Sequence, residues 1–182
     1  MAQFLKYLVQ LVLSPGKGWD ALAEEQPQAE ALMHRGLLPL LALTSLSEFA
    51  ALFWEQGLKF GTVLIRAVVD FGAYFVTVYI ARLIFDIYVG RFTAGQPDRE
   101  RVAVLTVMAV GIMVAIQLID NILPWNLVLL RFLPLYAVLV LYKSSSYMDV
   151  PPSREMNYMI MATLATVVTP LVIYYFFFFL LP

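Results

Sequence analysis

The sequence predicts an all-α fold: an integral membrane bundle of five transmembrane helices preceded by a pair of amphipathic interfacial helices. Of its 182 residues, 62% are apolar and 14% are charged, against roughly 45–50% and about 25% in ordinary soluble domains. The mean hydropathy is +0.80, and a soluble fold of this size exposes too many residues to hide that much apolar surface. Five segments are apolar over about the 20 residues that a membrane-crossing helix needs.

Charge and cysteine content exclude several classes of function. Twelve Lys and Arg against thirteen Asp and Glu give a net charge of -1, so the chain lacks the basic surface of nucleic-acid-binding proteins. The absence of cysteine excludes disulfides, thiolate metal sites and a cysteine nucleophile. The single histidine, His34, has no carboxylate at metal-ligand spacing, so we interpret it as an interfacial residue before the first span. We therefore expect no metal and no cofactor.

Residues 1–34 are predicted to form two interfacial helices. Apolar residues at positions 4, 5, 8, 9, 12 and 13 alternate with polar ones in an amphipathic pattern, and no small-residue cleavage site of a signal peptide follows. Ser14 as N-cap and Pro15 as first helical residue begin the second helix. Trp19 suits the membrane interface. We interpret the pair as a membrane-resting anchor, and a docking surface for a cytoplasmic partner is the alternative.

The chain is predicted to be a single membrane domain, residues 1–182, in which residues 36–182 form a five-helix transmembrane bundle. The second span is longer than a bilayer requires, so it must tilt or project, and Arg82 and Asp86 in its last turns form a separate pair. Pro39, Pro134 and Pro170 lie inside spans, where membrane helices tolerate them as kinks. The expected spans run from about Gly36 to Trp54, Leu58 to Val89, Val102 to Leu123, Asn126 to Tyr142 and Met156 to the C-terminus.

The connections differ in length. The turns Glu55–Gly57 and Leu123–Asn126 are short enough to require antiparallel hairpins. The loops Gly90–Glu100 and Lys143–Glu155 are longer and polar. The last span ends in an aromatic run, Tyr174–Phe179, which we interpret as a lipid-facing anchor, with a seam between copies or partners as the alternative.

Basic residues predict the orientation of the bundle, because they concentrate on the cytoplasmic side. Arg66, Arg82 and Arg131 fall within predicted helices and are not counted, so the side of the short turns has only Lys59, at the start of the second span. An odd number of spans then places the N-terminus in the cytoplasm and the C-terminus outside. The eight basic residues on the opposite side are Lys6, Lys17, Arg35, Arg91, Arg99, Arg101, Lys143 and Arg154.

The segment Leu13–Glu25, with Ser14-Pro15, then Trp19, then Glu24-Glu25, resembles the N-terminal motif of bacterial members of the Yip (Ypt-interacting protein) family. Leu38-Pro39-Leu40 is similar to a Pro-Leu that the family carries in its first span. The resemblance implies a helical multi-pass protein of the bacterial inner membrane. It offers no catalytic residues, and the link of eukaryotic relatives to small prenylated GTPases is not transferred, since a bacterial cell lacks those partners.

Ionisable residues at bilayer depth are the most informative feature, because they are costly there and usually face a bundle interior or a water-filled cavity. At 1.5 Å per residue, Glu48 and Arg66 flank the first short turn at depths of about 10 and 12 Å, and Asp120 and Arg131 flank the second at about 5 and 8 Å. With Gln117, these residues predict an intramembrane polar cluster: Glu48, Arg66, Asp70, Gln117, Asp120 and Arg131.

Asp70 is the surplus acid of this cluster. It lies about 18 Å along the second span, near mid-membrane, and can share Arg66 at i,i+4. Three acids against two arginines leave one carboxylate without its own cation. A purely structural ion-pair network and a water-accessible site for a proton, an ion or a lipid head group both fit this pattern.

No motif of a soluble enzyme occurs in the chain, which lacks a glycine-rich phosphate loop, H-E-x-x-H and G-x-S-x-G. The sequence therefore predicts a non-enzymatic Yip-like membrane protein. We expect a scaffold or adaptor that organises a protein partner or lipid; the alternative is a small transporter or channel for a proton, ion or lipid. The expected partners are the bilayer and either a membrane or cytoplasmic protein or a second copy of the chain, and nucleic acid is not among them.

Overall fold

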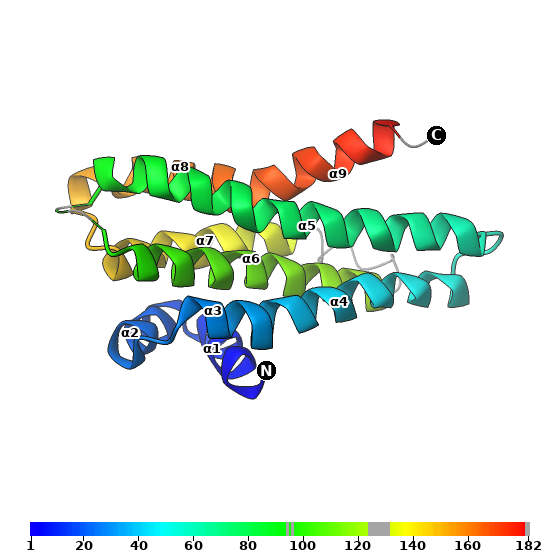
Figure 1. Ribbon diagram of the computed structural model, residues 1–182, viewed down its shortest axis with the longest axis horizontal. Helices are drawn as coiled ribbons and strands as arrows, with labels where there is room; N and C mark the ends of the chain where they lie inside the picture. The colour runs from blue at the N-terminus through cyan, green and yellow to red at the C-terminus, as the bar shows by residue number, and fades with distance from the viewer. Residues whose placement is uncertain (94, 96, 124–131, 181–182) are drawn as a thin grey trace.

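A computed structural model describes residues 1–93, 95, 97–123 and 132–180 (Figure 1), and all regular structure in these residues is helical, as predicted. In chain order the elements are α1 (Ala2–Leu13), α2 (Pro15–Glu25), α3 (Ala29–Leu32), η1 (Met33–Leu37), α4 (Leu38–Ser47), η2 (Glu48–Phe53), α5 (Phe60–Tyr88), η3 (Val89–Arg91), α6 (Arg99–Ile122), α7 (Leu133–Tyr147), η5 (Pro152–Arg154), α8 (Glu155–Thr163), η6 (Leu164–Val168) and α9 (Thr169–Leu180).

Four continuous helical stretches of the described residues are long and apolar enough to cross a membrane: Ala29–Phe53, Phe60–Arg91, Arg99–Ile122 and Pro152–Phe177. They coincide with the first, second, third and fifth predicted spans. The fourth predicted span begins in residues 124–131, which lie outside the described residues together with most of the second short turn. Its described part is α7, a helix of 15 residues.

The predicted loop that begins at Lys143 is wrong at its start, because α7 continues through Tyr147. Ser144 and Ser145 made this segment look like a polar connector, but both are buried. Ser144 Oγ donates to the carbonyl of Leu141 at 2.6 Å and lies 2.7 Å from the hydroxyl of Tyr158. A serine whose hydroxyl bonds to its own helix or to a neighbouring helix is compatible with a buried helical position.

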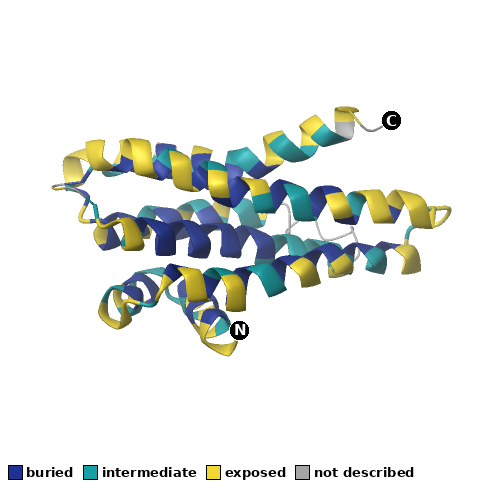
Figure 2. Cartoon of the chain, in the orientation of Figure 1, coloured by how far each residue is buried: buried dark blue, intermediate teal, exposed yellow. Residues whose placement is uncertain are grey.

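The centre of the bundle is α6. Every residue from Val102 to Val114 is buried, and Figure 2 shows this helix dark blue along most of its length. It contacts α3, α4, α5 and α7. A helix that is apolar all round is stable only where neighbours cover every face, and α6 occupies that position. The long helices run side by side along one axis. The end of η3, the start of α6 and the segment 148–154 lie at one end, here called the loop end, and residues 54–59 lie at the other, the turn end (Figure 1).

Two of the long helices contain a proline that follows shortly after a π-helical turn. The π-helical turns η1 and η6 each end two residues before a proline, Pro39 and Pro170. A proline clashes with the carbonyl four residues earlier, and a π turn relieves that clash within the helix. Pro134 was predicted to lie inside a span but is in the first turn of α7, where the missing N–H has no helical partner in any case.

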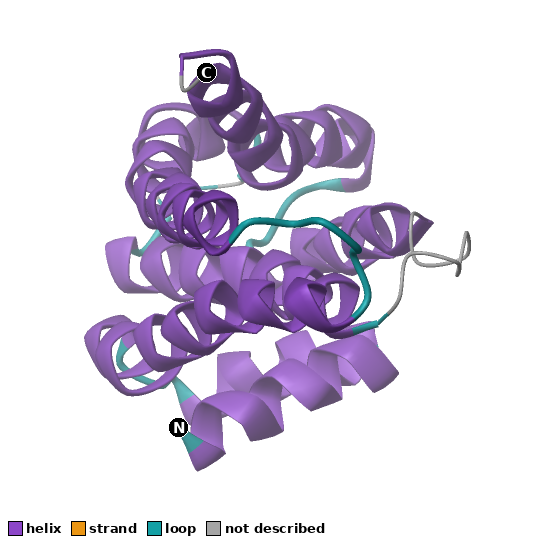
Figure 3. Cartoon of the chain, turned by 90° about the vertical axis from the view of Figure 1, so that its right-hand side faces the viewer, coloured by secondary structure: helices purple, strands orange, loops and turns teal. Residues whose placement is uncertain are grey.

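The amphipathic helix α1 lies across the bundle, seen end-on in Figure 1 and lengthwise in Figure 3. Its predicted apolar stripe is divided between two faces. Phe4 and Leu8, together with Tyr7 and Leu11, are buried against the protein, whereas the residues at positions 9, 12 and 13 are exposed. Phe4 packs so closely on the bundle that a Cβ placed at Gly36 would lie 2.3 Å from its Cγ, and one at Gly111 would lie 2.8 Å from its Cζ.

Helix α2 begins as predicted, with Ser14 as N-cap residue and Pro15 in the first turn. The placement of Trp19 at the membrane interface is wrong: its side chain is 0% exposed. The indole Nε1 donates to the carbonyl of Val140 at 2.9 Å, and the ring centroid lies 5.3 Å from that of Tyr147. The indole thus fills the contact between α2 and α7, where its N–H finds the partner that a buried tryptophan needs.

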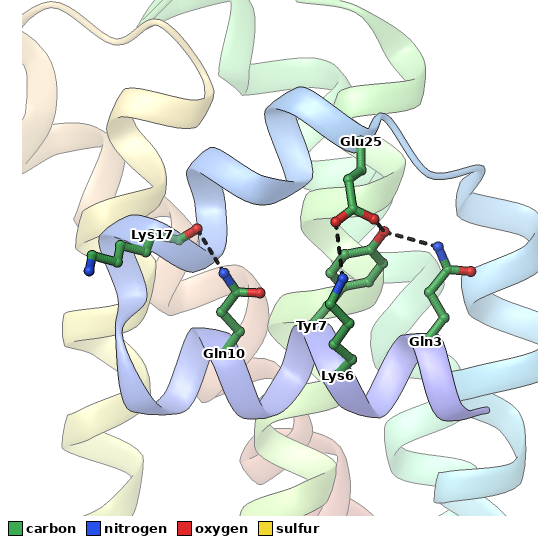
Figure 4. Close-up of polar contacts among 6 residues, drawn as sticks. All are labelled: Gln3, Lys6, Tyr7, Gln10, Lys17 and Glu25. Carbon is green, nitrogen blue, oxygen red and sulfur yellow. Dashed lines mark hydrogen bonds and ion pairs between the residues drawn. The ribbon is translucent and has the colours of Figure 1, made fainter.

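A polar network joins α1 to α2 beside this packing (Figure 4). The carboxylate of Glu25 accepts a hydrogen bond from the hydroxyl of Tyr7 and lies 3.2 Å from Lys6 Nζ. The hydrogen bond from Tyr7 and the contact with Lys6 hold the pKa of Glu25 below its ordinary 4.5. Burial and the hydrogen bond to Glu25 raise the pKa of Tyr7 above its ordinary 10.0.

The contact between α1 and α2 is therefore expected to weaken in acid. Because the pKa of Glu25 is lowered in the folded chain, its contribution to stability is complete above 4.5 and is lost as the pH falls through the lowered value. Thermal unfolding of wild type and Glu25→Gln in detergent, from neutral pH to below 4.5, is expected to show a stability difference that disappears in acid. The exposed neighbour Glu24 gives the control Glu24→Gln; if that variant loses the same pH dependence, the assignment to Glu25 is wrong.

The loop end holds further ion pairs. Arg82 and Asp86 form the predicted i,i+4 pair, with Nε and Oδ2 3.9 Å apart. Arg101 Nη1 lies 3.0 Å from Asp149 Oδ2 and so links α6 to the segment after α7. The carboxylate of Glu100 accepts a hydrogen bond from the backbone N–H of Ala29 at 2.6 Å, which satisfies one of the open donors at the start of the α3–η1–α4 helix. These contacts connect the helix ends around α6.

Candidate functional site

A cavity of about 270 Å³ lies toward the turn end of the bundle. Its walls come from four parts of the chain, and in each part the contributing residues recur at helical spacing. Its lining is polar deep in the bundle and includes aliphatic and aromatic groups on the side of α9. The lining residues are Glu48, Ala51 and Glu55 from η2 and the following turn; Arg66, Asp70, Ala73 and Tyr74 from α5; Gln117, Asp120 and Asn121 from α6; and Pro170, Leu171, Tyr174 and Tyr175 from α9.

Five of the six residues predicted to form the intramembrane polar cluster line this one cavity: Glu48, Arg66, Asp70, Gln117 and Asp120. The sixth, Arg131, lies outside the described residues. The residues that share the cavity come from segments far apart in the sequence. Counting depth along each helix therefore grouped these five residues, although it did not predict their individual partners.

Asp70 lies at the most buried part of the cavity wall. Its side chain is 1% exposed. Its Oδ2 is buried and has no hydrogen-bond partner among the described residues. Buried polar groups are nearly always hydrogen-bonded, so an unpartnered carboxylate oxygen on a residue that lines a cavity calls for a specific explanation. An occupant of the cavity or a bound proton would supply one.

Arg66 pairs differently from the prediction. Its Nη1 lies 3.3 Å from Glu55 Oε2, and no ion pair joins it to Glu48 or Asp70 in the described part of the chain. The physical reason is the direction of helical side chains, which lean toward the N-terminus of their own helix. The N-terminus of α5 is at the turn end, so Arg66 extends toward the turn that carries Glu55 and away from Asp70, one turn deeper.

Side-chain amides hold the α6 wall in place. Gln117 Nε2 donates to Asn121 Oδ1 at 2.9 Å, and Asn121 Nδ2 donates to the carbonyl of Thr44 at 3.2 Å and to Ser47 Oγ at 3.1 Å. The hydroxyl of Tyr74 donates to Gln117 Oε1 at 3.4 Å, which brings α5 into the same chain of hydrogen bonds. Buried networks of this kind fix the relative positions of membrane helices.

The charges around the cavity are unequal. Four carboxyl groups and one guanidinium line it within the described residues: Glu48, Glu55, Asp70 and Asp120 against Arg66. The single guanidinium is already paired with Glu55. Removing several like charges from water is costly unless protons or cations neutralise them. The two most buried of these carboxyl groups, Glu48 and Asp70, have no ion pair with Arg66, so this part of the lining is suited to hold positive charge.

Exposure falls from the surface to the base of the cavity. Tyr175 is 66% exposed, the side chains of Arg66 and Glu55 are 31% and 28% exposed, and Glu48 is 9% exposed. Asp70 is the most buried of these. Helix α9, which follows the π turn and Pro170, bends away from the axis of α8 and forms one wall (Figure 1). The polar lining thus extends from the partly exposed Arg66 and Glu55 to the buried Asp70.

The predicted cluster omits Glu55 and the tyrosines of α9. Glu55 looked like part of a turn signal and does lie in the turn after η2, but its carboxylate reaches the cavity and pairs with Arg66. The run that begins at Tyr174 was interpreted as a lipid-facing anchor. That interpretation is incomplete, because Tyr174 and Tyr175 line the cavity, whereas Phe176 and Phe179 are exposed.

Fold and site together define a class: a helical protein with four described helices able to cross a membrane and an acid-lined cavity among them. No group of three or more His, Cys, Asp or Glu side chains suited to a metal ion occurs in the described ranges. No protein-family model, curated protein or solved structure matches the chain. The function must therefore be argued from the cavity itself.

Proposed function

We propose that this chain is a non-enzymatic, five-span protein of the bacterial inner membrane that binds and releases a proton or small cation in its acid-lined cavity, as a small transporter does. The four long helices and α7 supply the spans, and the basic residues near the loop end support a cytoplasmic N-terminus and a periplasmic C-terminus. In that orientation the cavity opens toward the periplasmic half of the membrane. The resemblance to the Yip family is kept as part of this proposal.

The buried, unpartnered Oδ2 of Asp70 on the cavity wall carries the proposal. A purely structural network would pair each buried charge, because an unpaired charge in a low dielectric costs several kcal/mol. Here the available guanidinium is engaged with Glu55 and lies nearer the surface. Ionisable residues left in this state inside membrane proteins typically mark ion pathways or proton relays.

Asp70→Asn is the decisive variant. Asparagine has nearly the same shape but carries no charge and no exchangeable acid proton, so we expect the variant to fold and to lose ion movement by about tenfold or more. The measurement is the flux of protons and of Na⁺ or K⁺ into liposomes that contain the purified protein, driven by an imposed gradient.

Asp86→Asn is the matched control, because Asp86 is on the same helix but is exposed and paired with Arg82. It is expected to keep the wild-type flux. If Asp70→Asn moves ions as fast as wild type and the two proteins elute identically from a gel-filtration column, the cavity is structural and the transport proposal fails.

A scaffold or adaptor remains the second candidate, and one observation favours it. The α1–α2 unit is held to the bundle by Phe4 and Trp19, so α2 presents its exposed residues Asp20 and Glu24 as a fixed surface. Purification from mild detergent is expected to recover a partner that Asp20→Lys removes and Asp70→Asn does not. Repeated recovery of the chain alone counts against this role.

A further inference from the structure

We propose that the ligand of the cavity is a small organic ammonium ion and that it exchanges with a proton on Asp70. This inference rests on the proposed cation-binding function and specifies its ligand. Three properties of the cavity carry it: the combination of carboxylates with aromatic and aliphatic walls, the size, and the unpartnered oxygen at its base.

The wall chemistry favours an alkylated cation over a metal ion. A metal ion needs a shell of several oxygen ligands, and the described residues contain no group of three or more acidic or histidine side chains placed to provide one. The wall opposite the acids is formed by Leu171, Pro170 and the rings of Tyr174 and Tyr175. Aromatic faces attract ammonium groups, and aliphatic side chains are compatible with the alkyl groups around the nitrogen.

Three tyrosines bring aromatic rings to the cavity wall. Tyr74 is buried and its hydroxyl is engaged with Gln117, which leaves its ring as the part available to a ligand. Tyr174 and Tyr175 have ring centroids 6.0 Å apart and ring planes at 85°. Both residues line the cavity, so its wall includes two aromatic rings in different orientations.

The size limits the ligand. A volume of about 270 Å³ corresponds to about nine water molecules at roughly 30 Å³ each. Pockets for drug-sized molecules measure roughly 300–1,000 Å³. The cavity therefore suits one nitrogen with a few carbon atoms around it.

The exchange balances in atoms and charge. The O–H bond of the Asp70 carboxyl breaks, its electron pair stays on the oxygen, and the proton leaves to water along the polar lining as the ammonium ion enters. One positive charge replaces another, and nothing is oxidised or reduced. The affinity of the cavity for a cation also depends on the other charged and titratable groups that line it. They are Glu48, Glu55, Arg66, Tyr74, Asp120 and Tyr174.

Proton release on ligand addition tests the exchange. Tetramethylammonium chloride is added to the purified full-length protein in weakly buffered detergent solution with a pH indicator, and NaCl and KCl are added to matched samples. We expect about one proton released per chain with tetramethylammonium, none with Na⁺ or K⁺, and none from Asp70→Asn. Asp86→Asn is expected to behave as wild type.

Two substitutions of Tyr174 test the contribution of the aromatic wall. Tyr174→Leu is expected to weaken tetramethylammonium binding about two- to thirtyfold, whereas Tyr174→Phe, which keeps the ring, retains it. Equal proton release by Na⁺ or K⁺ overturns the choice of ligand and leaves the proposed function standing. Release that survives in Asp70→Asn overturns the exchange. If no cation releases protons and Asp70→Asn leaves ion flux unchanged, the proposed function fails as well.

Discussion

Replacing Trp19 with alanine is expected to lower the free energy of unfolding by about 3–5 kcal/mol, the usual cost of truncating a fully buried aromatic side chain. The indole is 0% exposed, donates a hydrogen bond to Val140 and packs on Tyr147, so its loss leaves a cavity between α2 and α7. Chemical denaturation in mild detergent, followed by circular dichroism, measures the change. A tryptophan resting at the lipid interface would cost much less to truncate.

Trp19→Phe separates packing from hydrogen bonding. Phenylalanine keeps most of the apolar contact and removes the N–H, so we expect a smaller loss of about 1–2 kcal/mol. Leu13→Ala is the control for a merely exposed apolar residue of the same N-terminal unit, since Leu13 is 79% exposed. Equal effects of Trp19→Ala and Leu13→Ala would contradict the buried contact between α2 and α7.

Gly36→Ala is expected to detach the start of α1 from the bundle. The added methyl group would lie 2.3 Å from Cγ and 2.5 Å from Cβ of Phe4, atoms too close to the backbone to move aside by rotation of the ring. Overpacking of this kind costs about 1–3 kcal/mol. That cost exceeds the gain of at most about 1 kcal/mol that alanine brings to a helix. Unfolding in detergent and proteolysis of the N-terminal helix report the loss.

Alanine substitutions at two other glycines are expected to cost less than Gly36→Ala. A methyl group at Gly111 meets the far end of the Phe4 ring at 2.8 Å and is expected to cost less. Gly72, within α5, has no atom within 4 Å of its added Cβ, so Gly72→Ala is expected to be neutral or stabilising. In the double variant with Phe4→Gly, which also removes the Cβ 2.5 Å away, the penalty of Gly36→Ala is expected to disappear. A penalty that remains in this double variant means that Phe4 is not its cause.

Much of the fold followed from elementary patterns in the sequence. Apolar length predicted the four long helices, and Pro15 predicted the start of α2. Depth along the helices predicted that Glu48, Asp70 and Asp120 belong to one polar cluster, because polar residues in membrane helices usually face the interior, and the three line one cavity. These inferences depend on one helix at a time, or on two helices joined by a short turn.

The errors arose where several helices meet. Nothing in the local sequence around Trp19 distinguishes a lipid interface from the groove beside α7, because both favour an indole with one polar partner. The pairing of Arg66 depends on which way its side chain leans, and counting positions along the helix ignores that direction. The role of Tyr174 depends on the path of α9 after Pro170, which periodicity alone does not predict.

The π turn at Leu164–Val168 affects the cavity, because the number of residues in this turn determines how α9 is rotated about its axis. A π turn holds one more residue than an α turn, so everything after it is rotated by about 100° relative to an uninterrupted α-helix. That rotation sets which side of α9 carries Tyr174 toward the acids and which side meets the lipid. Two homologous chains could thus have the same composition here, yet one without this extra residue would face the acids with a different set of side chains.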